Sequence, residues 1–216
     1  MKKNIAIFLS FIFLSFQAVK AEMAIGITGA LHMFDASGTE TTRNSLEKNT
    51  GSHSHDVLVP ELFVEAISDN GVALGLSYIP TREMGSKSRT DTNSDGDTGT
   101  YTAKAELANV AQIYVDVPLP IDLGYPVYAK LGAQHVTVKT LESLNSGTTY
   151  PDKDLLGLTI GLGTRGDLPY GDSLYYKFEV TYTDFETYSE TGGSTGNQLE
   201  ADFDDTAAKF SVGYKF

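Results

Sequence analysis

The chain contains no cysteine and no tryptophan among its 216 residues, and it has 16 lysines and arginines against 28 acidic residues. The absence of cysteine excludes disulfides, thiolate metal sites, cysteine nucleophiles and a lipid-anchored cysteine behind a signal peptide. The net charge of −12 argues against nucleic acid as a partner, because its phosphates require a basic surface. We expect no cofactor and no nucleic-acid partner.

The first 21 residues form a unit of their own. Lys2 and Lys3 give a basic start, residues 5–16 are almost wholly apolar, and Val19-Lys20-Ala21 suits a cleavage site. This order is typical of a signal peptide, and the apolar run is too short to span a bilayer. We predict cleavage after Ala21 and a mature domain over residues 22–216. Loss of the three lysines brings the mature net charge near −15.

Behind this segment, side chains alternate between apolar and polar with a period of two residues. The chain has no further run of about 18 apolar residues, so helical spans are not expected. The alternating segments are 25–33, 58–66, 72–78, 101–117, 127–134, 155–163, 174–182 and 206–216. Asn109 interrupts the apolar face of its segment, which indicates a bulge or the membrane edge.

The connections between these eight segments alternate in length. Long polar stretches rich in Gly, Ser, Thr, Asp and Glu occupy residues 36–55, 82–100, 141–154 and 188–205. Short turns occupy residues 68–71, 118–122 and 167–171. Long loops outside and short turns in the periplasm are typical of outer-membrane barrels. We expect the long loops to be mobile surface, where a binding or adhesion role would be located.

Alternation alone would also suit a soluble β-sandwich. The polar faces favour a barrel, because they carry charges of both signs that can pair inside a closed ring while the apolar faces meet lipid. The predicted inward charges are Lys104, Lys130, Lys177, Lys209, Glu61, Glu65, Glu106 and Glu179. The tyrosines expected at the membrane interfaces are Tyr78, Tyr101, Tyr125, Tyr182 and Tyr214. We predict an all-β fold, an eight-stranded antiparallel transmembrane β-barrel.

The C-terminal segment Phe210-Ser211-Val212-Gly213-Tyr214-Lys215-Phe216 carries hydrophobic residues at alternate positions and ends on an aromatic residue. It resembles the assembly signal of bacterial outer-membrane barrels. In size, strand number and loop asymmetry, the chain resembles the small opacity-type and OmpX/OmpW-like outer-membrane proteins. The resemblance implies the outer membrane of a Gram-negative bacterium, contact with membrane lipid, and recognition of the signal ending in Phe216 by the barrel assembly machinery.

The lumen of such a barrel has two possible states. Eight strands enclose just enough space for side chains to fill. Four lysines and four glutamates would plug this space by pairing, and the role would then be structural or surface-exposed. The same charges could instead line a narrow channel for small solutes or ions. We favour the plug, because unpaired charges in a low-dielectric interior are costly.

Two motifs suggest metal binding. Asp91-Thr92-Asn93-Ser94-Asp95-Gly96-Asp97 matches the first half of a calcium loop, but Thr102 stands where the bidentate glutamate belongs. A solvated acidic loop is therefore preferred. His53 and His55, next to Asp56, could hold a metal ion if they lie on one side of an extended segment. We interpret them as ordinary loop residues.

Two other histidines, His32 and His135, are predicted near the outer rim. Lipid-A deacylases and omptin-like proteases place a catalytic histidine there. Nominal partners exist in Ser143, Glu142 and Asp35, but no nucleophile–base motif links them. We predict no catalytic, cofactor-binding or metal-binding residue, and a rim-sited hydrolase is the second alternative to a structural barrel.

Overall fold

The computed structural model describes residues 21–92, 98–143, 150–169, 171, 173–193 and 195–216. The strands are β1 (Ala21–Thr41), β2 (Lys48–Ser68), β3 (Ala73–Ile79), β4 (Arg82–Thr92), β5 (Thr98–Pro118), β6 (Val127–Ser143), β7 (Lys153–Asp167), β8 (Leu174–Phe185), β9 (Tyr188–Thr191) and β10 (Gln198–Lys215). In the described part of the chain, no helix is long and apolar enough to cross a bilayer. Residues 1–20 of the predicted signal peptide and residues 93–97 of the calcium motif lie outside the described residues.

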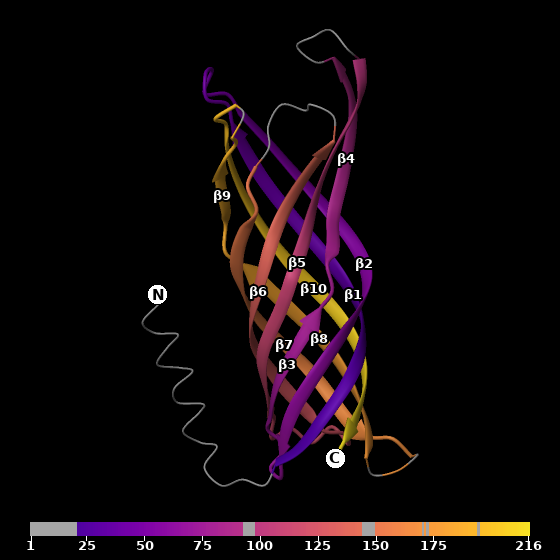
Figure 1. Cartoon of the computed structure of the whole chain (residues 1–216). Helices are drawn as coiled ribbons and strands as arrows, with labels where there is room; N and C mark the ends of the chain where they lie inside the picture. The colour runs from indigo at the N-terminus through magenta and orange to yellow at the C-terminus, as the bar shows by residue number, and fades with distance from the viewer. Residues whose placement is uncertain (1–20, 93–97, 144–149, 170, 172, 194) are drawn as a thin grey trace.

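The strands form one antiparallel ring, which closes where β1 pairs with β10 (Figure 1). Two positions of the ring hold two strands each. At one, β3 and β4 both pair with β5, on either side of residues 80–81. At the other, β8 and β9 both pair with β10, on either side of residues 186–187. The ten strands therefore occupy eight strand positions in the ring, as the sequence predicted.

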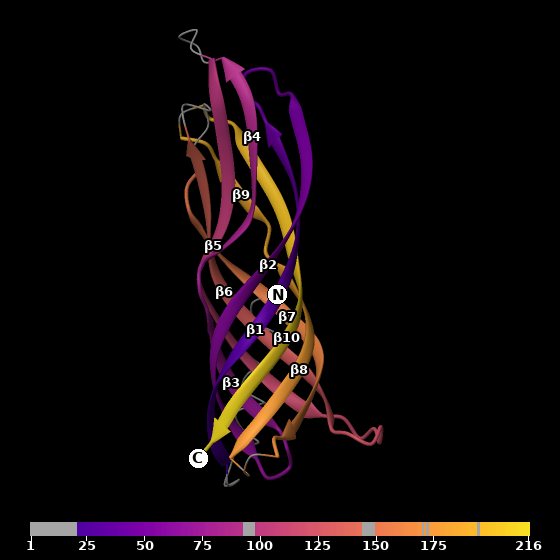
Figure 2. The ribbon, with the colours of Figure 1, turned by 90° about the vertical axis from the view of Figure 1, so that its right-hand side faces the viewer.

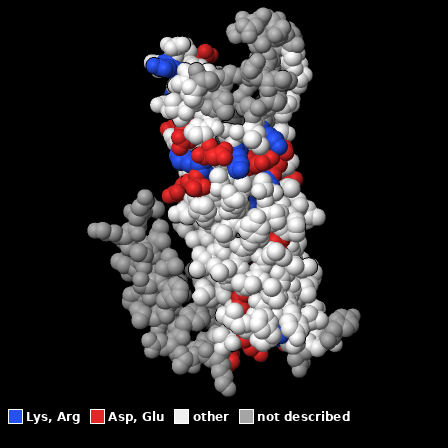
Figure 3. Space-filling model, viewed as in Figure 1, with Lys and Arg blue, Asp and Glu red and all other residues white. Residues whose placement is uncertain are grey.

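The outer wall of the lower half carries the apolar faces that the alternation predicted. Ile27, Ile160 and Val180, on three different strands, are each more than half exposed. Figure 3 shows a mostly uncharged zone between a band of charged side chains and the lower end. Four of the five predicted interfacial tyrosines are exposed, namely Tyr78, Tyr125, Tyr182 and Tyr214, and the side chain of Tyr101 lies outside the described residues. Such a surface is stable only against lipid.

The outer loops are shorter than predicted, because the strands continue into them. β1 and β2 have 21 residues each, although about 9–11 residues suffice to cross a membrane. Only residues 42–47 connect them, instead of the predicted 36–55. The strands thus continue into an extension of the barrel above the charged band (Figures 1 and 3). The alternation fades there because the outside of the extension does not meet lipid, while backbone pairing continues.

A bulge in β5 corrects the prediction for two of the inward charges. Asn109 has a φ of 51°, and the pairing of β5 with β6 shifts register between Ala108 and Ala111. One extra residue reverses which side chains face inward. Lys104 and Glu106 therefore lie on the outside of the extension, 2.7 Å apart and partly exposed. The hydrogen bond from Lys104 to Glu106 raises the pKa of the lysine.

Candidate functional site

The lower lumen contains a compact group of charges, here called the lumen cluster. Its members are Glu65, Asp116, Lys130, Arg165, Lys177 and Glu179. Lys177 Nζ lies 2.9 Å from Glu65, 3.0 Å from Asp116 and 3.5 Å from Glu179. Lys130 Nζ lies 2.9 Å from both Asp116 and Glu179. Three acids face three bases, so the cluster is neutral and its charges are paired.

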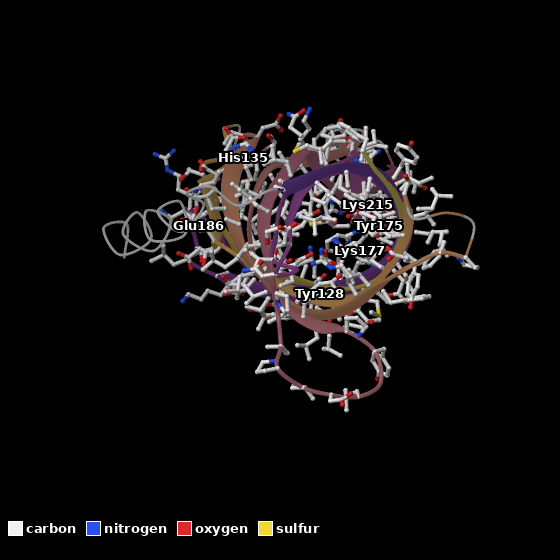
Figure 4. The ribbon with its side chains drawn as sticks, turned by 90° about the horizontal axis from the view of Figure 1, so that it is seen from below. Tyr128, His135, Tyr175, Lys177, Glu186 and Lys215 are labelled. Atoms are coloured by element: carbon white, nitrogen blue, oxygen red, sulfur yellow. The ribbon has the colours of Figure 1, made fainter. Side chains whose placement is uncertain are left out.

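Three tyrosines complete the cluster by donating hydrogen bonds to its carboxylates. Tyr114 and Tyr175 donate to Glu65 at 2.7 and 2.8 Å, and Tyr128 donates to Glu179 at 2.8 Å. Seen from below, Tyr128, Tyr175 and Lys177 lie within the ring, whereas His135 and Glu186 lie at its periphery (Figure 4). Buried carboxylates that are both paired and hydrogen-bonded recover much of their lost hydration.

A layer of uncharged polar side chains lies next to the lumen cluster. Gln112 donates a hydrogen bond to Thr159 at 2.8 Å, and the hydroxyls of Thr159 and Thr183 are 2.8 Å apart. A void bordered by Gln112, Lys130 and Lys177 has a volume of about 10 Å³. That is roughly the space of a single water molecule. Side chains therefore fill this level of the barrel.

A second charged group surrounds His32. Its Nδ1 lies 2.7 Å from Asp205, and its Nε2 lies 3.0 Å from Glu61. Lys209 also donates to both oxygens of Glu61, at 2.9 and 3.0 Å. The guanidinium of Arg82 lies 3.8 Å from Asp205 and 5.2 Å from the centre of the Phe34 ring.

Above Arg82, the interior of the extension is apolar. Buried side chains from all ten strands and from the connection before β7 pack together there: Phe34, Val59, Ile79, Met84, Leu107, Val110, Val136, Val138, Tyr150, Leu155, Phe185, Tyr188 and Phe203. Burial is the largest influence that raises the pKa of Tyr188, to about 12. The interior therefore changes from charged to apolar along the axis of the barrel, and the sequence analysis did not anticipate this change.

In the described wall of the extension, β2 and β4 lie next to each other but are not paired, and this break in the strand pairing is here called the seam. In the described residues β4 pairs with β5 alone, and β2 begins to pair with β3 only at Leu62. A pocket of about 270 Å³ lies beside the seam. It is lined by His53, Met84, Gly85, Ser86, Lys104, Ala105, Thr140, Leu141, Tyr150 and Leu199. A side chain added to Gly85 would strike the ring of His53, so this histidine lies directly across the seam.

Among the described side chains, the structure does not bring His32, His135 and Asp35 together. His32 lies inside the lumen with carboxylates at both ring nitrogens, and not at the rim. His135 is on the outer wall, half exposed and 4.0 Å from Asp154. Asp35 is exposed and accepts a hydrogen bond from Ser54. The side chains of Glu142 and Ser143 lie outside the described residues.

Of the two motifs that suggested metal binding, one lies on β2 and the other begins at the end of β4. The rings of His53 and His55 are stacked with centroids 6.5 Å apart, so they share one side of β2, and β2 is a strand where a loop was predicted. Among the described side chains, no group of three histidine, aspartate or glutamate residues is arranged to hold a metal ion. Of the calcium motif, residues 93–97 are not described, so Asp91, Asn93 and Asp95 stay an open hypothesis.

The chain is an integral outer-membrane β-barrel. It forms a closed antiparallel ring with eight strand positions, an apolar outer zone and a charged interior. Its place is the outer membrane of a Gram-negative bacterium. The end that carries Phe216 and the short connections is the periplasmic end, and the extension points outward.

Comparison with known proteins supports this class at the level of fold. The outer-membrane protein OprG from Pseudomonas aeruginosa is similar, with 17% identity and a TM-score of 0.56, over 93% of this chain and 98% of OprG. The outer-membrane protein AlkL is similar with 12% identity and a TM-score of 0.50, over 92% of this chain and 91% of AlkL. No family model and no curated protein sequence matches the chain.

Proposed function

We propose that the protein is a structural, surface-exposed outer-membrane barrel whose lumen is closed to ions and solutes. The observation that carries this proposal is the lumen cluster, in which three acids and three bases pair inside the ring. The void beside it, of about 10 Å³, has room for roughly one water molecule, which supports closure at that level. The extension would present the outer hairpins well beyond the lipid surface.

Planar-bilayer recordings of the purified mature protein test this closure. We expect no discrete openings in the wild type. The double variant Glu65→Ala/Lys177→Ala removes one charge of each sign and empties the centre of the cluster, so we expect it to leak. The matched control is Lys104→Ala/Glu106→Ala, which removes an ion pair on the outside of the extension and should stay closed. Regular openings in the wild type would establish the narrow channel instead.

A second candidate function is the uptake of small apolar molecules into the membrane through the extension. The specific observation in its favour is the pocket of about 270 Å³ beside the seam, with Met84, Ala105 and Leu199 in its lining. An apolar molecule entering there would find an apolar interior above the charged groups and, at the seam, an edge of β4 that pairs with no strand in the described residues. The closed lumen cluster would then direct it sideways, away from the periplasm.

Binding of a fluorescent hydrocarbon such as pyrene to the protein in detergent-free vesicles tests the second candidate. Ala105→Phe fills the pocket and should reduce saturable binding at least tenfold, whereas Leu58→Phe on the lipid-facing wall should leave it unchanged. If the wild type shows only the partitioning of empty vesicles, the second candidate is wrong and the closed barrel is unaffected.

We also propose that residues 1–21 are removed on export and that the C-terminal segment directs assembly. The Phe216 amide donates a hydrogen bond to the Met23 carbonyl at 2.9 Å, but its ring is mostly exposed. Deleting Phe216 should therefore cost little stability once the barrel is folded, and should still strongly reduce insertion in cells, whereas Phe216→Tyr should preserve it. The measurement is the heat-modifiable fraction in isolated outer membranes. Full insertion of the deletion variant would contradict the proposal.

A further inference from the structure

The connection between β5 and β6 is longer and more apolar than a periplasmic turn needs to be. It spans residues 119–126, instead of the predicted 118–122, and is here called the periplasmic lip. Ile121, Leu123 and Tyr125 alternate along it, and each is more than half exposed. Asp122 is its one charged residue. By contrast, the connection between β2 and β3 is the polar tight turn of residues 68–71.

The backbone of the lip is held in a defined conformation. The Leu119 amide donates to the Val127 carbonyl at 2.8 Å, and the Ile121 amide donates to the Leu119 carbonyl at 2.8 Å. Gly124 adopts a φ of 79°, and its amide donates to the Asp122 carboxylate at 3.1 Å. Because this conformation is fixed, the exposure of its apolar side chains is a built feature of the surface.

The lip projects sideways from the wall and does not extend below the other turns (Figure 2). The view from below shows the same segment standing clear of the ring (Figure 4). A groove of about 580 Å³ runs between the lip and the wall, and its lining is almost wholly apolar. The lip contributes Leu123 and Tyr125, and the wall contributes Leu162, Phe178 and Val180.

We propose that the periplasmic lip inserts into the inner leaflet of the outer membrane and that an acyl chain of a phospholipid occupies the groove. We assign lipid as the occupant because the far side of the groove is the same apolar wall that meets the hydrocarbon of the membrane. Tyr125 is more than half exposed, as an aromatic residue at the membrane interface would be in the folded chain. The Asp122 carboxylate accepts a hydrogen bond from the Gly124 amide, so the one charge of the lip has a partner within the lip.

The absence of tryptophan from the chain makes a direct test possible. Leu123→Trp places a single fluorophore on the lip, Ile160→Trp places one on the lipid-facing wall outside the groove lining, and Asp69→Trp places one in the polar turn between β2 and β3. Each mature variant is folded into phosphatidylethanolamine/phosphatidylglycerol vesicles with and without acyl-brominated phosphatidylcholine. Heat-modifiable mobility confirms that each variant has folded.

We expect the fluorophore at position 123 to emit at shorter wavelength than that at position 69, and bromolipid to quench it at least half as strongly as that at position 160. Quenching no stronger than at position 69 would overturn the proposal, since the lip would then lie in water. Short-wavelength emission without bromolipid quenching would also overturn it, because protein would cover the groove. Cross-linking at position 123 would then show whether that protein is a second copy of this chain.

Discussion

Replacing Lys177 with methionine is expected to destabilise the folded barrel by about 3–5 kcal/mol. Lys177 is 2% exposed and lies within 3.5 Å of Glu65, Asp116 and Glu179. Methionine has a similar length but no charge, so three buried carboxylates would share only Lys130 and Arg165. The free energy of unfolding is measured from urea-dependent folding into vesicles, where a folded barrel is recognised by its heat-modifiable mobility.

The matched control is Lys104→Met, which breaks an ion pair on the outside of the extension. Exposed pairs are worth about 0–1 kcal/mol, so this variant should fold almost as well as the wild type. If both substitutions had the same small effect, the pairing in the lumen cluster would not contribute to stability. If Lys104→Met had the larger effect, the bulge at Asn109 would have been placed wrongly.

An arginine on the lipid-facing wall is expected to have the second large effect. Ile160 is 58% exposed and lies between the exposed Leu158 and Leu162 on its strand, and Ile160→Arg should cost about 2–4 kcal/mol. Leu141 points outward from β6 at the level of Lys104, its pairing partner on β5, above the membrane. Leu141→Arg should therefore cost about 0–1 kcal/mol. The same urea titration checks both, and equal costs would show that the boundary between lipid and water has been misplaced.

The part of the fold that meets lipid could be predicted from the sequence. There, one face of each strand must be apolar and the other polar, so the pattern specifies both the strand and its orientation. Glu61, Glu65, Lys130, Lys177, Glu179 and Lys209 are all buried inside the barrel, as their positions in the alternation predicted. Strand number, antiparallel order and the closed ring follow from the same constraint.

Other features depend on events that the alternation does not encode. The residue pattern located the bulge at Asn109 but did not show that it reverses the faces beyond it, so Lys104 and Glu106 were placed inside. His32 shares the polar face of its segment with Thr28, and that periodicity was the available signal that it points inward. The strands of the extension were missed because neither of their faces is defined by lipid.

Four residues of the charged groups, Asp116, Arg165, Asp205 and Arg82, were also absent from the predicted set, and three of them lie outside the alternating segments. Arg165 follows the last alternating residue of its segment, and Asp205 fell in a stretch predicted to be a loop. Arg82 fell at the start of another such stretch, yet it is almost fully buried beneath the apolar interior. Which charges pair with which depends on the stagger of the strands around the ring, and a single sequence does not specify that stagger.

The central claim is that apolar side chains face lipid while the charges between them are enclosed. The most direct test is to dilute the denatured mature chain out of urea with and without phospholipid vesicles. Folding is followed by heat-modifiable mobility and by the far-UV circular dichroism of β-structure. We predict a folded, heat-modifiable barrel only when vesicles or detergent are present. A folded, monomeric and water-soluble protein in buffer alone would contradict the claim.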